Sequence, residues 1–284
     1  MRTAEPVATG LAFKAREIEE LVDIYFFRRL GIVFAHAARA LGLSPTTVTF
    51  GALFAGAIGG AMLAWPGWAP IGVVFLFLHG VLDSSDGQLA RMTGRSTEFG
   101  RVMDGVAGYV THVAMYLGIL ASASARGWGW ELVGLAAAAG FSTIVHAQMY
   151  DYHRTTYATF AIKGSIPPAV AGTPHTGLLG FYEGMQRALA GLHPVVERRL
   201  AGRALAGQVR DEDRQLYRTC FYRPVRGWNL MGDNLRRLSI ALAVWAGRPE
   251  WFVFAELIPV NLACGALWLL QQRADRRFLA ATAR

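Results

Sequence analysis

Six apolar stretches constrain the fold of this chain more than any other feature. They cover residues 47–65, 69–86, 100–122, 131–150, 236–247 and 251–271, and the fifth is the shortest. A helix needs about 20 apolar residues to cross a bilayer, and in lipid it satisfies its own backbone hydrogen bonds. The pattern therefore predicts an all-α polytopic membrane protein with six transmembrane helices.

Residues 14–30 have the periodicity of an amphipathic helix. Their apolar positions recur at helical spacing, whereas their acidic positions face the other side: Ile18, Leu21, Val22, Tyr25 and Phe26 against Glu19, Glu20 and Asp23. A helix of this kind lies in the plane of a membrane interface. We expect an N-terminal amphipathic interfacial helix.

The basic charge of the chain follows its predicted topology. The sequence holds 28 lysines and arginines against 20 acidic residues, a net charge of +8. If the N-terminus lies inside and all six segments span, only Arg126 and Arg248 fall outside. This asymmetry is typical of membrane proteins and argues against a nucleic-acid partner. It predicts a multi-pass protein of the cell (inner) membrane with both termini in the cytoplasm.

The same segments divide the chain into four parts. We expect a cytoplasmic N-terminus at 1–46, four transmembrane helices at 47–150, a cytoplasmic insertion at 151–235, and two further helices with a cytoplasmic tail at 236–284. The insertion should contain a helix from about 178 to 201. It is either a solvated subdomain, a cap over the active site or a docking element for a partner. Cys220 and Cys264 are expected to form no disulfide.

Polar residues that could carry chemistry gather where the second apolar segment ends and the third begins. They are Asp83, Asp86, Arg91 and Asp104, and the small residues Gly87, Ala90 and Gly100 stand among them. Carboxylates at a membrane boundary repel one another unless a cation pairs with them, and oxygen ligands suit Mg²⁺ or Mn²⁺. Small residues leave room for a bulky ligand, and an arginine fork suits phosphate oxygens. Together these residues predict a cradle for a metal ion and a diphosphate.

The spacing D-x2-D-G-x2-A-R-x8-G-x3-D resembles the signature of the CDP-alcohol phosphotransferase (CDP-alcohol phosphatidyltransferase) family. A second, weaker likeness lies at Pro45 and Thr49, although Thr46 stands where the family has asparagine; Ser44 is predicted to cap the helix that starts there. The resemblance implies a transferase of lipid synthesis. It would move a phosphoalcohol from a CDP-alcohol, such as CDP-diacylglycerol, to an acceptor hydroxyl and release CMP.

The resemblance also implies roles for single residues. By position, Asp83, Asp86 and Asp104 would be metal ligands, whereas Gly87, Ala90, Arg91 and Gly100 would shape the nucleotide and diphosphate site. It implies a homodimer among membrane lipids. The signature concerns the CDP part that all donors share, so it does not specify the donor or the acceptor alcohol.

One position departs from the family pattern, because Gly108 stands where the signature has a fourth aspartate. In the family that aspartate looks like the base that takes the acceptor's proton. Another residue could replace it, with His112 and His79 as candidates, or the acceptor could supply its own base. Alternatively, the protein is a non-catalytic relative that binds the metal and the CDP-alcohol. Glu256, His146 and Gln148 are further polar residues within apolar segments, and Glu256 either serves a substrate or lies wetted at the outer boundary.

Overall fold

The computed structural model describes residues 16–95, 97–167, 170 and 177–283. Over this part of the chain the regular structure is helical, with isolated β-bridges in place of strands. The chain forms two compact units. In the described part, unit 1 comprises residues 20–140 and 233–255, and unit 2 comprises residues 16–19, 141–232 and 256–283. The predicted all-α class is confirmed.

Among the described residues, five helical segments are long and apolar enough to cross a membrane. They are Pro45–Met62, Ala69–Thr93, Val102–Ser124, Trp130–Lys163 and Trp251–Ala281. The predicted span 236–247 falls in α9 (Asp233–Trp245), which has 13 residues and so measures about 20 Å, short of a bilayer core of about 30 Å. The polytopic architecture is confirmed, and the count of six spans stays a prediction.

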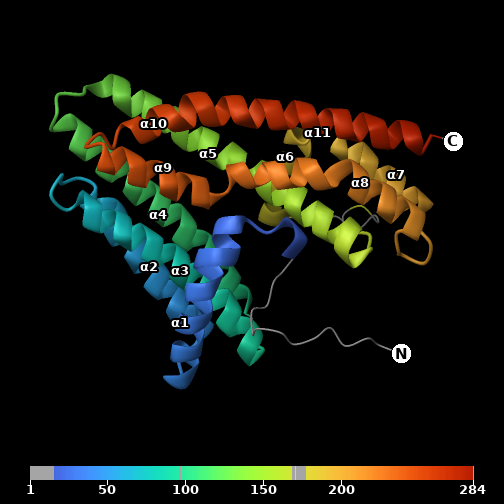
Figure 1. The fold of residues 1–284 in the computed structure, drawn as a ribbon, viewed down its shortest axis with the longest axis horizontal. Helices are drawn as coiled ribbons and strands as arrows, with labels where there is room; N and C mark the ends of the chain where they lie inside the picture. Colours follow the sequence, from blue (N-terminus) through green and yellow to red (C-terminus); the bar gives the residue numbers. More distant parts are fainter. Residues whose placement is uncertain (1–15, 96, 168–169, 171–176, 284) are drawn as a thin grey trace. The chain divides into compact units, whose positions relative to one another are not determined.

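Unit 1 is built around α2 (Pro45–Met62). This helix packs against α3 (Ala69–Thr93) and α4 (Glu98–Ser124), and Figure 1 shows the three as neighbours. Both α1 (Arg28–Ala40) and α9 pack against α3, and α10 (Trp251–Ala255) packs against α9. Thus α3 is surrounded by α1, α2 and α9.

Glycines let these helices approach closely. A Cβ atom at Gly59 of α2 would lie 2.8 Å from the carbonyl oxygen of Gly72 in α3, and one at Gly60 would lie 2.5 Å from the nitrogen of Met115 in α4. Close crossings through small residues are the usual way helices associate in lipid, where no hydrophobic force drives them together. The α2 glycines therefore set the spacing of unit 1.

The N-terminal helix differs from its predicted boundaries of 14–30. After a 3₁₀ turn at Arg16–Ile18, a π-helical turn at Asp23–Phe27 leads into α1, which continues to Ala40. The predicted apolar face is largely exposed, with Leu21 58% and Tyr25 65% exposed, and so is available to lipid.

The acidic face of this segment was predicted wrongly. Within unit 2, Glu19 is buried and its Oε2 lies 3.4 Å from Nη2 of Arg154. Within unit 1, Glu20 is buried and accepts a hydrogen bond of 2.6 Å from Nδ2 of Asn234. Both carboxylates have partners that come from distant parts of the chain, and helical periodicity carries no information about such partners.

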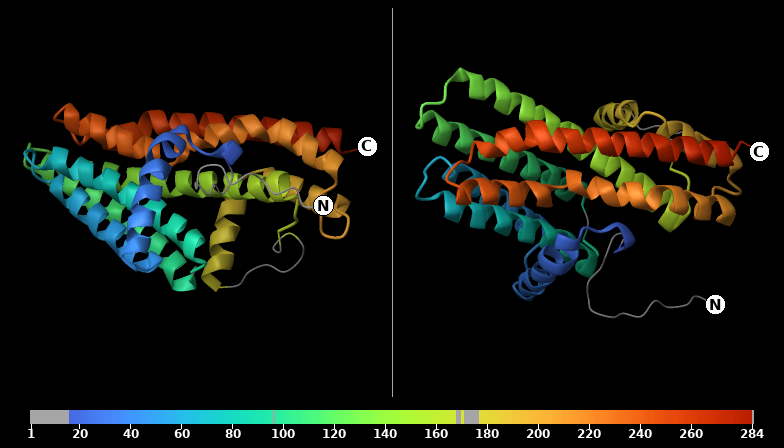
Figure 2. Two further views of the ribbon diagram at one scale, coloured as in Figure 1. Left: turned by 60° about the horizontal axis from the view of Figure 1, so that its bottom comes forward. Right: turned by 45° about the horizontal axis from the view of Figure 1, so that its top comes forward.

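Unit 2 contains the later part of α5 (Trp130–Tyr157), together with α6 (Gly177–Leu189), α7 (His193–Arg203), α8 (Asp211–Trp228) and α11 (Asn261–Ala281). Figure 2 shows α8 beside α11, and the two are in contact. The helix predicted at 178–201 is two helices, because Gly191 has a left-handed backbone (φ +66°) and Pro194 stands in the first turn of α7. Cys220 and Cys264 are free, as predicted.

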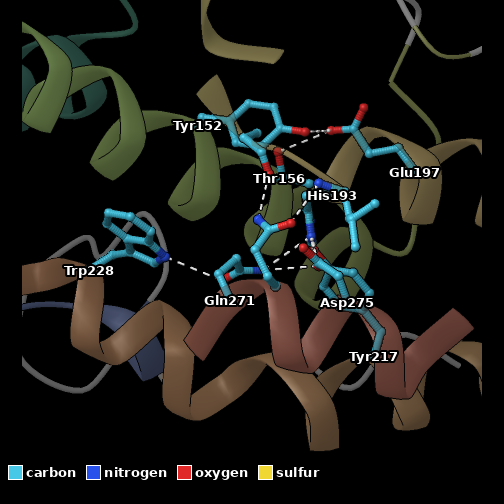
Figure 3. A network of polar contacts seen from close by, with 11 residues as sticks. Tyr152, Thr156, His193, Glu197, Tyr217, Trp228, Gln271 and Asp275 are labelled. Atoms are coloured by element: carbon cyan, nitrogen blue, oxygen red, sulfur yellow. Dashed lines mark hydrogen bonds and ion pairs between the residues drawn. The ribbon is translucent and has the colours of Figure 1, made fainter. Parts of the chain in front are cut away.

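A buried polar network joins the helices of unit 2 (Figure 3). His193 of α7 lies at its centre, with Nδ1 2.6 Å from Oδ1 of Asp275 and Nε2 3.0 Å from the hydroxyl of Tyr217. Burial, reinforced by the carboxylates of Glu197 and Asp275, raises the pKa of Tyr217 well above its ordinary value. The phenol therefore keeps its proton and donates a hydrogen bond to Nε2 of His193. Since these residues come from α7, α8 and α11, the network holds the three helices in one arrangement.

The close crossing of α2 and α4 predicts a position-specific effect of adding one methyl group. Gly60→Ala should lower the free energy of unfolding by about 1–3 kcal/mol, because the new Cβ overlaps the α4 backbone. Gly134→Ala is the matched control, since a Cβ there meets no atom within 4 Å. Denaturant unfolding in detergent measures both, and equal stability of the two variants would contradict the packing described here.

Candidate active site

The acidic motif spans the junction of α3 and α4. Helix α3 ends at Gly94, whose left-handed backbone (φ +65°) breaks the helix after Arg91. Helix α4 starts after Thr97, whose Oγ1 accepts a hydrogen bond of 3.0 Å from the nitrogen of Gly100. The spacing of eight residues between Arg91 and Gly100 thus includes the end of α3 with Gly94 and the start of α4 capped by Thr97.

The first turn of α2 contacts both arms of this junction. Ser44 caps α2 as predicted, accepting a 3.1 Å hydrogen bond from the nitrogen of Thr47. The hydroxyl of Thr49 lies 2.6 Å from Oδ2 of Asp86, to which it donates. On the other arm, a Cβ at Gly100 would lie 3.5 Å from Oγ1 of Thr46. The start of α2 therefore brings the end of α3 and the start of α4 to one place.

The three motif carboxylates differ in their surroundings. Asp86 is 7% exposed, Asp83 is half-buried on the same helix, and Asp104 is exposed in the second turn of α4. Their oxygen atoms are the donors that Mg²⁺ and Mn²⁺ prefer. Among the residues that the structure describes, however, no three His, Cys, Asp or Glu side chains gather closely enough to hold a metal ion. The joint action of the three carboxylates stays a prediction.

Small residues keep the surface of α3 open beside its arginine. A Cβ at Gly87 would lie 3.4 Å from Nη1 of Arg91, so the guanidinium folds back toward the helix backbone. Arg91 itself is exposed, and Ala90 and Gly87 are half-buried. An exposed guanidinium over a bare stretch of helix is suited to bind phosphate oxygens.

Helix α1 supports the motif helix from another side. Nε2 of Gln88 donates to the carbonyl oxygen of Arg28 at 3.1 Å and to Oγ of Ser84 at 3.2 Å. A Cβ at Gly31 would lie 2.8 Å from both Gln88 and Ser84, so only glycine permits this approach. Ser84 and Gln88, which lie on either side of Asp86, are therefore held by packing against α1 rather than left mobile.

The position of the missing fourth aspartate is open. A Cβ at Gly108 would meet no heavy atom within 4 Å. One turn further along α4, Nδ1 of His112 lies 2.9 Å from the carbonyl oxygen of Gly108, and its Nε2 lies 3.6 Å from Oδ1 of Asp233. The other candidate base, His79, is 3% exposed and its Nδ1 donates to the carbonyl oxygen of Ala52. The two histidines thus differ in access, since the His112 side chain is 23% exposed.

A small cavity of unit 1 joins both histidines to α9. Its volume is about 20 Å³, and its polar lining consists of His79, Thr111, His112, Asp233, Arg236 and Arg237. Partial removal from water opposes ionisation of Asp233, but its neighbours, His112 when protonated, Arg237 and Arg236, outweigh this and lower the pKa of Asp233. The sequence contains no signal for these α9 residues, because they lie more than 120 residues after the motif.

The polar residues predicted within later apolar segments belong to unit 2. Oε2 of Glu256 lies 3.5 Å from Nδ1 of His146 and accepts a 3.3 Å hydrogen bond from Thr143. Nε2 of His146 lies 3.1 Å from Oδ1 of Asn261, and both Glu256 and His146 are buried. Gln148 is buried too. These contacts hold α5 to the start of α11, and they make Glu256 a buried, paired group rather than a wetted one.

The bond between Thr49 and Asp86 predicts a test of the site's framework. Thr49→Val keeps the side-chain shape but leaves a buried carboxylate without its hydroxyl donor, which should cost about 1–3 kcal/mol of stability. Thr49→Ser keeps the hydroxyl and should cost less. Thermal unfolding in detergent compares the two, and a Thr49→Val protein as stable as wild type would refute the role of this bond.

The helices that carry the acidic motif lie in a stretch of the chain that matches a known protein family. Residues 43–174 match the model of the CDP-alcohol phosphatidyltransferase family, and the matched stretch begins just before α2 and includes the whole α3–α4 junction. No curated protein and no solved structure matches the chain. The family transfers phosphoalcohols in lipid synthesis, and residues 43–174 of this chain are a CDP-alcohol phosphatidyltransferase domain.

Proposed function

We propose that the protein is a metal-dependent transferase that moves a phosphoalcohol from a CDP-alcohol to an acceptor hydroxyl and releases CMP. One observation carries this proposal. Within the matched domain, the start of α2 contacts both arms of the acidic motif, through Thr49 on Asp86 and through Thr46 beside Gly100. These contacts support the proposal that the motif residues belong to one site.

The residues of the α3–α4 junction would bind different parts of the metal and donor complex. Asp83, Asp86 and Asp104 would hold Mg²⁺ or Mn²⁺, which, when bound, neutralises charge on the diphosphate. Arg91 binds phosphate oxygens of the donor by its guanidinium fork. Gly87 and Ala90 let the diphosphate lie against α3, and Gly100 keeps the start of α4 close to α2.

The transfer exchanges one phosphorus–oxygen bond for another. The acceptor oxygen attacks the phosphorus that carries the donor's alcohol, and a new phosphodiester bond forms. The bond to the bridging oxygen breaks, and CMP leaves with its electron pair. The acceptor hydroxyl loses a proton to a base. Positioning and charge stabilisation would supply most of the rate enhancement in such a displacement.

The setting of the site suggests its place in the cell. A donor such as CDP-diacylglycerol would enter from the bilayer, and the product would be a membrane lipid. The basic residues favour a cytoplasmic site and cytoplasmic termini in the inner membrane. A homodimer is part of this proposal because of the family resemblance.

A second candidate function follows from Gly108. A relative without its family's fourth aspartate could bind the metal and the CDP-alcohol without turning the donor over. This binding function and the transferase differ in one measurable product, which is CMP.

Purified protein should release CMP from at least one member of a panel of CDP-alcohols when Mg²⁺ or Mn²⁺ is present. Chelation of the metal should abolish the release, because three carboxylates and a diphosphate cannot share a site without a cation. Asp83→Asn and Asp104→Asn should each lower metal affinity by calorimetry and abolish CMP release.

Glu183→Gln is the matched control, since it removes one carboxylate from unit 2 and should change neither quantity. Unchanged metal affinity in both aspartate variants would refute the metal site. Binding of CDP-alcohol and metal by wild type, without CMP release from any donor, would support the second candidate.

One contact of unit 1 bears on the proposed topology. Arg126 and Arg248, the two basic residues predicted outside, both pair with the buried Glu250; Nη1 of Arg248 lies 3.7 Å from its Oε1. The loops after α4 and α9 therefore meet, which supports the part of the proposal that places both on the same side of the membrane.

Cysteine labelling of intact cells tests this orientation. In a background without Cys220 and Cys264, a membrane-impermeant maleimide should modify Ala125→Cys, at the exposed end of α4. It should not modify Gly202→Cys, on an exposed surface of α7, until the membrane is opened. The reverse pattern would place the acidic motif on the outer face.

A further inference from the structure

Three positions of α4 share one helix face, and one of them is Gly108, where the family has the aspartate that looks like its general base. Asp104, Gly108 and His112 follow one another at intervals of four residues, so their side chains lie in a row. Side chains of a helix slant toward its N-terminus and cover the turn before their own Cα. The imidazole of His112 accordingly lies over the turn of Gly108, as its 2.9 Å contact with the Gly108 carbonyl oxygen shows.

That contact defines which nitrogen of His112 carries a proton. A carbonyl oxygen can only accept, so Nδ1 must be the donor in this hydrogen bond. In the neutral ring, Nε2 then has the lone pair. The backbone of Gly108 thereby orients the ring of His112 with a basic nitrogen directed away from its own helix.

A carboxylate from α9 faces this nitrogen. Oδ1 of Asp233 lies 3.6 Å from Nε2 of His112, which is longer than a hydrogen bond and leaves the nitrogen available to a hydroxyl group. The side chain of Asp233 is 45% exposed, so a solute can reach the pair. Arg236 and Arg237 lie 3.7 Å and 3.9 Å from the same carboxylate and help to keep it ionised.

The pair lies in the same region of unit 1 as the motif. His79 lines the cavity with His112 and Asp233, and it lies one turn before Asp83 on α3. It is within electrostatic range of both Asp83 and Asp233. His79 itself is nearly inaccessible, so of the two histidines only His112 can meet a substrate.

We propose that His112 is the general base of this enzyme, in place of the absent fourth aspartate, and that Asp233 is the residue that stabilises its protonated ring. The inference rests on the proposed transferase function. As the acceptor oxygen bonds to phosphorus and CMP departs with its electron pair, the acceptor's proton passes to Nε2 of His112. The protonated ring then carries two N–H groups, one toward the Gly108 carbonyl and one toward Asp233, and it returns the proton to water before the next turnover.

The decisive experiment moves the base back to its family position. His112→Ala should lower kcat for CMP release by about 10²–10⁴-fold, because general-base assistance is lost, with little change in donor affinity. Adding Gly108→Asp to His112→Ala should raise kcat at least tenfold above that of His112→Ala alone, since a side chain at position 108 meets no obstruction. Gly108→Asn with His112→Ala is the matched control and should restore nothing, because an amide accepts no proton.

A pH profile separates the role of Asp233 from simple packing of α4 against α9. The charged and titratable groups that line the cavity with His112 are Asp233, Arg236 and Arg237 of α9 and His79 of α3, whereas α2 carries no ionisable side chain. Without the carboxylate, the protonated ring is less favoured. Asp233→Asn should therefore move the acidic limb of the kcat profile to lower pH, which loss of packing alone would not do.

The outcomes distinguish this inference from the proposed function. Active wild type with full activity in His112→Ala would overturn the base assignment and leave the transferase intact. Failure of Gly108→Asp to restore activity, in a double variant that still binds donor and unfolds at the wild-type temperature, would overturn it too. An unmoved acidic limb in Asp233→Asn would overturn the role of Asp233. Wild type that releases no CMP from any donor would overturn the transferase and the base together.

Discussion

The close approach of α2 to two other helices is the constraint on which unit 1 depends. Gly59 and Gly60 let α2 touch the backbones of α3 and α4. Only at that separation can the short side chains of the first α2 turn reach the motif. The 2.6 Å hydrogen bond from Thr49 to Asp86 and the near contact of Thr46 with Gly100 are results of this packing. In lipid, where polar groups are costly to leave unpaired, such contacts favour one arrangement of the three helices.

The candidate site combines buried side chains, held by neighbouring helices, with exposed charged side chains. Asp86 and Gln88 are buried and held by neighbouring helices, whereas Arg91 and Asp104 are exposed at the ends of α3 and α4. Buried partners cannot change position without breaking hydrogen bonds, and exposed groups can meet a charged ligand. If these groups bind the donor as proposed, they already stand at defined places and no loop has to be ordered first.

Unit 2 is stabilised by a different principle. Its helices enclose aromatic side chains, and its polar groups are joined in networks around His193 and around the pair of His146 and Glu256 (Figure 3). Buried polar groups of this kind stabilise only one relative position of the helices, because each hydrogen bond has a directional partner. The insertion is thus largely helical over its described residues, and it shares its hydrophobic core with Ile18 and with Ala274 and Phe278 of α11.

The sequence alone determined the helical membrane class, the family and the residues of the acidic motif. Lipid admits few backbone solutions, so apolar length predicts spanning helices, and a signature within 22 residues is local enough to be seen in one reading. The cap at Ser44 and the free cysteines were predictable for the same local reason. By contrast, the burial of Glu19 and Glu20 depends on partners distant in sequence.

Only the tertiary structure decided what surrounds the motif. The partner of Asp86 comes from another helix, the distinction between His112 and His79 rests on their exposure, and the carboxylate facing His112 comes from α9. No periodicity or spacing in the sequence marks these contacts, because they form where two helices cross. Local patterns determine which helices form, and the packing of those helices determines which of their side chains can act together.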